Sequence, residues 1–166
     1  MSPTEPRPRA AVLTISTSRA AGEAVDQGGP ALASFAETLG LEVEVRETIT
    51  DDAVLISERL RHLCDEVGVA LVLTTGGTGF APTDVTPEAT RAVIERQAPG
   101  IAEAMRAVSR DHTPHWMLSR AVAGIRDATL IINFPGSPKS ISEIGAALRP
   151  ALPHALALLS GRSDSH

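Results

Sequence analysis

The chain is poor in aromatic residues and in cysteine. Its 166 residues include one Trp, three Phe, no Tyr and a single cysteine, Cys64. So few aromatic rings argue against a surface on which the bases of single-stranded nucleic acid could stack. One cysteine excludes an intramolecular disulfide and a zinc site made of several cysteines. Cys64 follows Ile56, Leu60 and Leu63 at helical spacing, so we predict a buried core thiol and not a nucleophile.

Other functional signatures are also missing. The five histidines show no metal-ligand spacing such as HExxH, and no apolar run approaches the roughly 20 residues of a membrane helix. The net charge of −5 disfavours nucleic acid or an anionic membrane as a partner. The start, MSPTEPRPR, lacks the hydrophobic stretch of a signal peptide. We therefore expect a cytoplasmic protein without nucleic-acid or membrane partners.

The residues that are present are typical of one globular domain. Hydrophobic residues make up 43% of the chain and charged residues 21%, which supports an aliphatic core. We expect a flexible tail over residues 1–9, one domain over 10–160 and a second tail over 161–166. Strand patterns occur over 11–16, 41–49, 70–73 and 128–132, and helical patterns over 29–39, 51–67, 86–97, 99–109, 113–122, 137 onward and 150–159.

This alternation predicts a three-layer α/β fold, with a mostly parallel sheet covered by helices on both faces. Residues 41–49 alternate apolar with charged side chains, so we expect them at an edge of the sheet. In such folds ligands bind beyond the carboxyl ends of the strands. The loops over 16–29, 48–52, 75–86 and 133–140 all follow strands, so we expect them to meet at one rim.

The glycine-rich stretch ALVLTTGGTGFAPTDVTPEAT, residues 70–90, is the most informative segment. Gly76, Gly77 and Gly79 would let the backbone approach a ligand closely. Thr86 is expected to cap a helix whose free amides could hold phosphate. The loop has neither the Gly-Lys-Ser/Thr of a P-loop nor the third glycine of a dinucleotide-binding loop. From these residues alone, an ordinary strand-to-helix turn is equally open.

Acidic residues and a helix start add further candidates. Asp84 either closes a turn or ligates Mg²⁺ beside a phosphate. Asp51 and Asp52 precede a helix, and either could be its N-cap. Ser137 begins another helix, whose free amides could bind an anion. Lys139 would add a positive charge there, although an isolated lysine is more often a solvated surface residue.

Several segments together carry a family resemblance. TTGGTG, DVTPEAT and NFPGSPKS, with STSR and DQGG in the first loop, resemble the molybdenum-cofactor biosynthesis family that includes the molybdopterin adenylyltransferases of MogA/MoaB type. The resemblance covers residues 10–160 and implies that family's fold. It also implies the family's reaction, in which the terminal phosphate of molybdopterin is joined to AMP from MgATP and pyrophosphate is released. The family assembles as trimers, so the resemblance implies a homotrimer.

The resemblance also implies roles for individual residues. Asp51 and Asp84 match the family's catalytic acids and would hold magnesium, with the neighbouring Asp52 leaving an ambiguity of one residue. The other matching residues would bind pterin or phosphate: Ser16, Arg19 and Asp26 in the first loop, Gly76, Gly77, Thr78, Gly79 and Thr86 in the glycine-rich loop, and Pro135, Gly136, Ser137 and Lys139 in the last.

Two departures from the family pattern leave other functions open. Thr83 stands where members often carry a basic residue, and Gly28 where a serine is common. The retained glycines of the glycine-rich loop, together with Thr83, fit a second hypothesis, a paralogue that binds molybdopterin without turnover. A third hypothesis is a nucleotide-processing domain of the same fold, like that joined to competence-damage proteins, although no second domain is visible in the sequence. Turnover with MgATP separates the first two.

Overall fold

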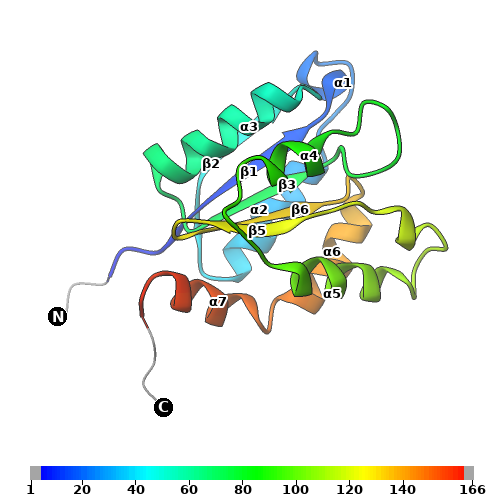
Figure 1. Ribbon diagram of the computed structural model, residues 1–166. Coiled ribbons are helices and arrows are strands. Elements are labelled where there is room, and N and C mark those ends of the chain that lie inside the picture. Colours follow the sequence, from blue (N-terminus) through cyan, green and yellow to red (C-terminus); the bar gives the residue numbers. More distant parts are fainter. Residues whose placement is uncertain (1–4, 163–166) are drawn as a thin grey trace.

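Within the described residues, six strands form one sheet in the order β2-β1-β3-β6-β5-β4 (Figure 1). The computed structural model describes residues 5–162, so the outermost parts of the two expected tails lie outside it. Four strands run parallel: β1 (Arg9–Ile15), β2 (Glu42–Ile49), β3 (Leu71–Thr75) and β6 (Thr129–Phe134). The remaining two, β5 (Ala123–Arg126) and β4 (Arg96–Gln97), are antiparallel. The expectation of a mostly parallel sheet is confirmed.

The position of each strand in the sheet follows from its side-chain pattern. Every residue of β3 and of β6 is buried, as expected of central strands covered on both faces. In contrast, β2 alternates exposed and half-buried residues along most of its length and lies at an edge. The expectation of an edge strand over residues 41–49 is therefore confirmed.

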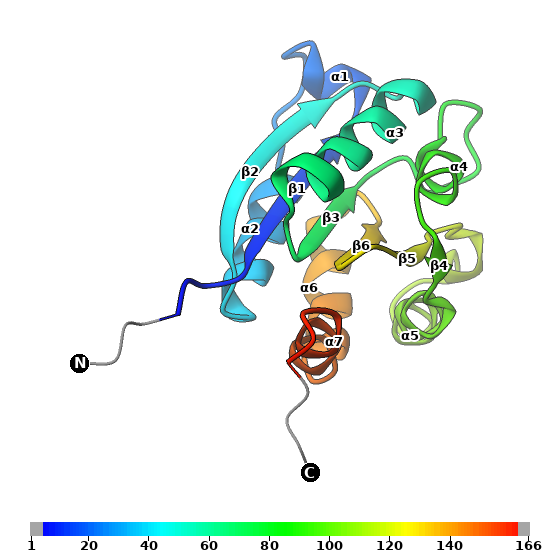
Figure 2. The ribbon, with the colours of Figure 1, turned by 60° about the vertical axis from the view of Figure 1, so that its left-hand side comes forward.

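Helices cover both faces of the sheet, as Figure 2 shows. On one face lie α2 (Gly28–Thr38), α5 (Pro99–Ser109), α6 (Pro138–Leu148) and α7 (Leu152–Leu159). On the other lie α3 (Ala53–His62), which continues into the π-helical turn η1 (Leu63–Val67), and α4 (Thr86–Arg91). The short helix α1 (Thr17–Ala20) follows β1. No helix in the described part of the chain is long and apolar enough to cross a membrane.

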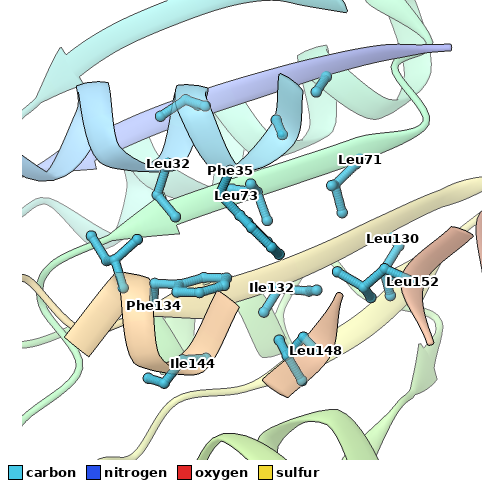
Figure 3. Packing of buried hydrophobic residues seen from close by; sticks show 14 of the residues in the cluster. Leu32, Phe35, Leu71, Leu73, Leu130, Ile132, Phe134, Ile144, Leu148 and Leu152 are labelled. Atoms are coloured by element: carbon cyan, nitrogen blue, oxygen red, sulfur yellow. The ribbon is translucent and has the colours of Figure 1, made fainter. Parts of the chain in front are cut away.

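The core is aliphatic apart from one aromatic pair. Phe35 of α2 and Phe134 at the end of β6 have ring centroids 5.8 Å apart at an interplanar angle of 56°. Leucine and isoleucine side chains from β3, β6 and α6 surround them (Figure 3). Burying each of these side chains contributes about 1.5–3 kcal/mol. On the opposite face, Cys64 packs among Leu60 and Leu63, which confirms the prediction of a core thiol.

Two expected helices are wrong, and both errors concern the antiparallel part of the sheet. The helix expected over residues 86–97 ends at Arg91, and the chain then forms β4 beside β5. Residues 113–122 form only the 3₁₀ turn η2 (Trp116–Leu118), because the next residues turn into β5. A tight turn at Asp127, with φ of 49°, connects β5 to β6. Aspartate tolerates this left-handed conformation better than most residues.

Candidate functional site

The loops at the carboxyl ends of the parallel strands meet at one rim of the sheet. The Ser16 amide donates to the carbonyl of Ile49 at 2.9 Å, and the Gly76 amide donates to that of Phe134 at 3.1 Å. The Thr75 hydroxyl donates to the Pro135 carbonyl at 2.8 Å. These bonds join the first loop to the end of β2 and the glycine-rich loop to the last loop. The expected convergence is confirmed.

Two of the three glycines in the glycine-rich loop have backbone conformations that favour glycine. Gly76 has φ of 99° and Gly77 has φ of 67°. A Cβ on Gly76 would lie 2.4 Å from the Ile15 carbonyl oxygen, and one on Gly77 would lie 2.4 Å from Thr86 Oγ1. Substitution at either position would therefore be strained and crowded. The loop passes as bare backbone between β1 and the start of α4.

Thr86 connects this loop to α4 through hydrogen bonds and does not cap the helix. The helix begins at Thr86 itself, and Val85 occupies the cap position. The buried hydroxyl of Thr86 donates to the Gly76 carbonyl at 3.0 Å, and its amide donates to the Gly77 carbonyl at 3.2 Å. The expected capping role was wrong because the Thr86 hydroxyl is a donor to the Gly76 carbonyl and not an acceptor for the amides at the start of the helix. Gly76 follows the last residue of β3, so its carbonyl has no partner strand there.

The two adjacent acids after β2 have different partners. Asp52 Oδ1 accepts hydrogen bonds from the amides of Val54 at 2.9 Å and Leu55 at 3.0 Å, so Asp52 caps α3. Asp51 Oδ2 accepts from the amide of Thr17 at 2.9 Å and from its hydroxyl at 3.0 Å. Asp51 Oδ1 lies 3.4 Å from the position that a Cβ on Gly77 would take. Of the two acids, Asp51 therefore faces the glycine-rich loop.

Asp84 closes a turn within the glycine-rich loop. Its Oδ2 accepts from the Ala81 amide at 3.0 Å, and its own amide donates to the Ala81 carbonyl at 2.9 Å. The same oxygen lies 2.9 Å from the position of a Cβ on Gly79, so the carboxylate folds back over that glycine. The turn role that the sequence left open is thus present, and it leaves one carboxylate oxygen for another partner.

The first loop is organised around Asp26. Its Oδ2 accepts from the Thr14 hydroxyl at 2.7 Å, and its Oδ1 accepts from the Gly29 amide at the start of α2 at 2.9 Å. Beside it lies a polar cavity of about 260 Å³, which Arg46 and Thr48 of β2 also line. Ser16 and Arg19 pair with each other, Arg19 Nη1 donating to Ser16 Oγ at 3.3 Å.

The last loop presents the start of α6. The Ser137 hydroxyl caps this helix and accepts from the Ser140 amide at 3.5 Å. Gly136 lies against Gly76, since a Cβ on it would be 3.9 Å from the Gly76 Cα. The Lys139 side chain is 83% exposed, and its ammonium lies 4.0 Å from the Glu143 carboxylate. The structure thus brings Gly136 to the glycine-rich loop but leaves Lys139 in solvent at the helix start.

Of the two departures from the family pattern, Gly28 lies at a crowded position in the structure, where a side chain would meet close neighbours. A Cβ at Gly28 would lie 3.0 Å from Thr75 Oγ1 and 3.5 Å from the Gly136 carbonyl oxygen. A side chain there would therefore press on both β3 and the last loop. Thr83 is exposed on the arc between Gly79 and Asp84.

The sequence reasoning did not single out Arg120, which is the residue most closely tied to the glycine-rich loop. Its amide donates to the Thr78 carbonyl at 2.8 Å, and its Nε donates to the Gly79 carbonyl at 2.8 Å. Nη2 donates to the Asp84 carbonyl at 2.7 Å, and Nη1 pairs with the Glu88 carboxylate. This hydrogen bond from Arg120 lowers the pKa of Glu88. Its one sequence signal is the stretch LSRA, residues 118–121, which lies within the range 10–160 that resembles the family.

The carboxylates at this rim suit a metal that is bound partly by its substrate. Within residues 5–162, no cluster of three or more His, Cys, Asp and Glu side chains could hold a metal ion by itself. Magnesium typically takes one or two protein carboxylates and completes its shell with water and substrate phosphates. Asp51 and Asp84, on neighbouring loops with oxygen ligands only, fit that pattern.

Comparisons of the sequence with family models and with known proteins point to the same family. A family model described as a probable molybdopterin binding domain matches residues 11–154. A molybdopterin adenylyltransferase from Helicobacter pylori (strain J99) is 48% identical over 115 residues, which cover 69% of this chain and 65% of that protein. A gephyrin from Dictyostelium discoideum is 40% identical over 163 residues, which cover 93% of this chain and 23% of that protein.

The fold agrees with the sequence matches. The crystal structure of the molybdopterin biosynthesis enzyme MoaB from Thermus thermophilus matches with a TM-score of 0.87 at 45% identity, over 93% of this chain and 97% of that one. The chain therefore belongs to the molybdopterin binding domain family. It spans just under two thirds of the Helicobacter relative and about a quarter of gephyrin.

Proposed function

We propose that this protein acts in molybdenum cofactor biosynthesis as a molybdopterin adenylyltransferase. The relatives from Helicobacter pylori and Escherichia coli that carry this name are 48% and 46% identical to it. The observation that carries the proposal is that the Asp51 carboxylate lies beside Gly77 of the glycine-rich loop. A carboxylate oxygen there faces a stretch of bare backbone, at the rim where α/β folds bind their ligands.

The reaction transfers an adenylyl group. A terminal phosphate oxygen of molybdopterin attacks the α-phosphorus of ATP, the bond between the α-phosphorus and its bridging oxygen breaks, and pyrophosphate leaves. Such a step depends on positioning and charge stabilisation more than on a protein nucleophile. In our proposal the backbone of residues 76–79 receives the pterin or its phosphate, and Thr86 holds that backbone in place through its bonds to Gly76 and Gly77. The start of α6, at Pro135, Gly136 and Ser137, receives an anionic group.

We further propose that magnesium enters with ATP and is held by Asp51 and Asp84. When bound, the ion neutralises phosphate charge. Thr17 fixes one oxygen of Asp51, and Ala81 fixes one oxygen of Asp84, so each carboxylate is oriented before substrate arrives. Ser16, Arg19 and Asp26 line the other side of the rim in this proposal. Lys139 contributes charge near the start of α6 without a direct contact.

The decisive test is turnover. The protein is incubated with molybdopterin, MgATP and pyrophosphatase, and adenylylated molybdopterin is sought by mass spectrometry. Product that forms only in the complete mixture supports the proposed enzyme. Binding of molybdopterin without any product would instead favour the carrier function.

We also propose a homotrimer that works in the cytoplasm, where ATP is available. The family resemblance supports the trimer. Apolar side chains exposed on the single chain, among them Val54 and Met117, give it surface to bury. Light scattering at micromolar protein should return a trimer mass, and a monomer mass would contradict the assembly.

A further inference from the structure

We propose that Arg120 is a positioning residue that holds the arc from Gly79 to Asp84 in place and thereby fixes Asp84 for the adenylyl transfer. This inference rests on the proposed function. It adds a residue that would touch neither substrate and would act through the loop backbone.

The contacts of Arg120 enclose this arc at both ends. Its Nε donates to the Gly79 carbonyl at 2.8 Å, and its Nη2 donates to the Asp84 carbonyl at 2.7 Å. A guanidinium presents its donors in a rigid planar fork, so these two bonds set the distance between the ends of the arc. The residues between them, 80–83, are exposed. The fork thus restrains both ends of an exposed segment whose internal bonds join only Ala81 and Asp84.

A third group orients the fork. Nη1 of Arg120 pairs with the carboxylate of Glu88, which lies in the first turn of α4. Because α4 begins immediately after the loop, this pair ties the guanidinium to the same helix start at which Thr86 holds Gly76. The amide of Arg120 adds a backbone bond to Thr78 at 2.8 Å. Arg120 therefore contacts the glycine-rich loop at three successive places.

The chain contains a second arginine with similar bonding far from the rim. Arg126 donates from Nε and Nη2 to the Asp65 carboxylate at 2.8 and 2.7 Å, and from Nη1 to the Val93 carbonyl at 3.0 Å. It pairs with Thr129 at the amino end of β6, whereas the site lies at the carboxyl end. Arg126 thus offers a matched control: a forked arginine that stabilises the fold and does not touch the loop.

Because Arg120 would act through the geometry of the loop, its substitution should give a specific kinetic pattern. Arg120→Lys keeps the charge but cannot span both carbonyls. We expect kcat to fall about 10- to 100-fold, because a displacement of about 1 Å in a catalytic group can cost about a hundredfold. We also expect a higher magnesium concentration for half-maximal activity, since Asp84 is no longer fixed. Glu88→Gln keeps Arg120 in place but weakens its orientation, so its effect should be in the same direction and smaller.

The experiment compares wild type, Arg120→Lys, Glu88→Gln and Arg126→Lys. Each is measured for melting temperature, kcat, KM for MgATP and the magnesium concentration for half-maximal activity. The inference is supported if the Arg120 and Glu88 variants stay folded with lower kcat and a raised magnesium requirement, while Arg126→Lys loses thermal stability with near-normal kinetics. It is overturned if Arg120→Lys behaves like Arg126→Lys, losing stability with near-normal kinetics.

The outcomes separate this inference from the proposed function. If wild type makes no adenylylated product, the proposed function fails. If wild type is active and Arg120→Lys has the same kcat and magnesium requirement, only the role of Arg120 fails. Should Arg120→Lys not fold, Glu88→Gln decides, and unchanged kinetics in that variant overturn the inference.

Discussion

Thr17 and Asp51 bind each other reciprocally across 34 residues of sequence. Thr17 donates to Asp51 Oδ2 from both its amide and its hydroxyl, and the Asp51 amide points back at the Thr17 oxygen at 3.2 Å. The pair joins the start of α1 to the loop after β2. Because Oδ2 is held in this way, the orientation of Asp51 is set by the fold and not by a ligand.

The two neighbouring acids should separate stability from activity. Asp52→Ala removes the cap of α3 and should cost about 1 kcal/mol of folding free energy with near-normal turnover. Asp51→Asn should leave the melting temperature almost unchanged and lower turnover by about a hundredfold or more, typical of losing one preorganised electrostatic group. Thermal melts and single-turnover assays on the same preparations provide the measurement. The reverse pattern would show that Asp52 is the functional acid.

Asp84→Asn tests the second carboxylate without removing its turn. The amide oxygen of asparagine can still accept from Ala81, so the fold should be preserved. The loss of negative charge should lower turnover by about a hundredfold or more. The measurement again combines a melt with single-turnover kinetics. Near-normal turnover with reduced stability would mean that Asp84 serves only the turn.

Lys139→Ala probes the charge at the start of α6. The lysine is mostly exposed, so its removal should hardly affect stability. Affinity for molybdopterin or MgATP should fall at low salt, and the difference should shrink at high salt, where screening already weakens the attraction. Calorimetric titrations at two ionic strengths measure this. Equal affinities in both proteins would remove Lys139 from the site.

Cys64 should be unreactive in the folded protein. Burial is the main cause that raises the pKa of its thiol, to about 11, and the thiolate is the reactive form. At pH 8 a thiol reagent should therefore label the native protein slowly and the urea-unfolded protein at once. As pH rises from about 9 towards 11, the unfolded thiol ionises before the folded one, so stability should fall. Cys64→Ala should lose less stability over that window, and rapid native labelling would contradict the assignment.

The parallel half of the fold was predictable because its signals are local. Continuous apolar runs mark β3 and β6, and Gly40 and Gly68 end the helices before β2 and β3 with the positive φ expected of such positions. The meeting of the loops followed from topology alone. Asp52 was one of two candidate caps, and its hydrogen bonds decide between them.

The antiparallel half and the loop contacts were not predictable in the same way. β5 has four residues and β4 has two, so neither is long enough to show a period. The start of α4 depends on a hydroxyl that satisfies Gly76, ten residues earlier. Arg120 lies 41 residues from Gly79 in the chain, and no periodicity reports a contact over that distance.

The rim is completed late in the synthesis of the chain. Gly76 donates to the carbonyl of Phe134, and Thr75 donates to that of Pro135, so both bonds await the last strand. A nascent chain that stops before Phe134 contains the residues of β1, β2 and β3 but lacks the two carbonyl acceptors that Gly76 and Thr75 use. Contacts of such long sequence separation form slowly in general. Ligand binding should therefore be detected only after the chain has been synthesised through Pro135, because the glycine-rich loop then has both of its partners in the last strand and loop.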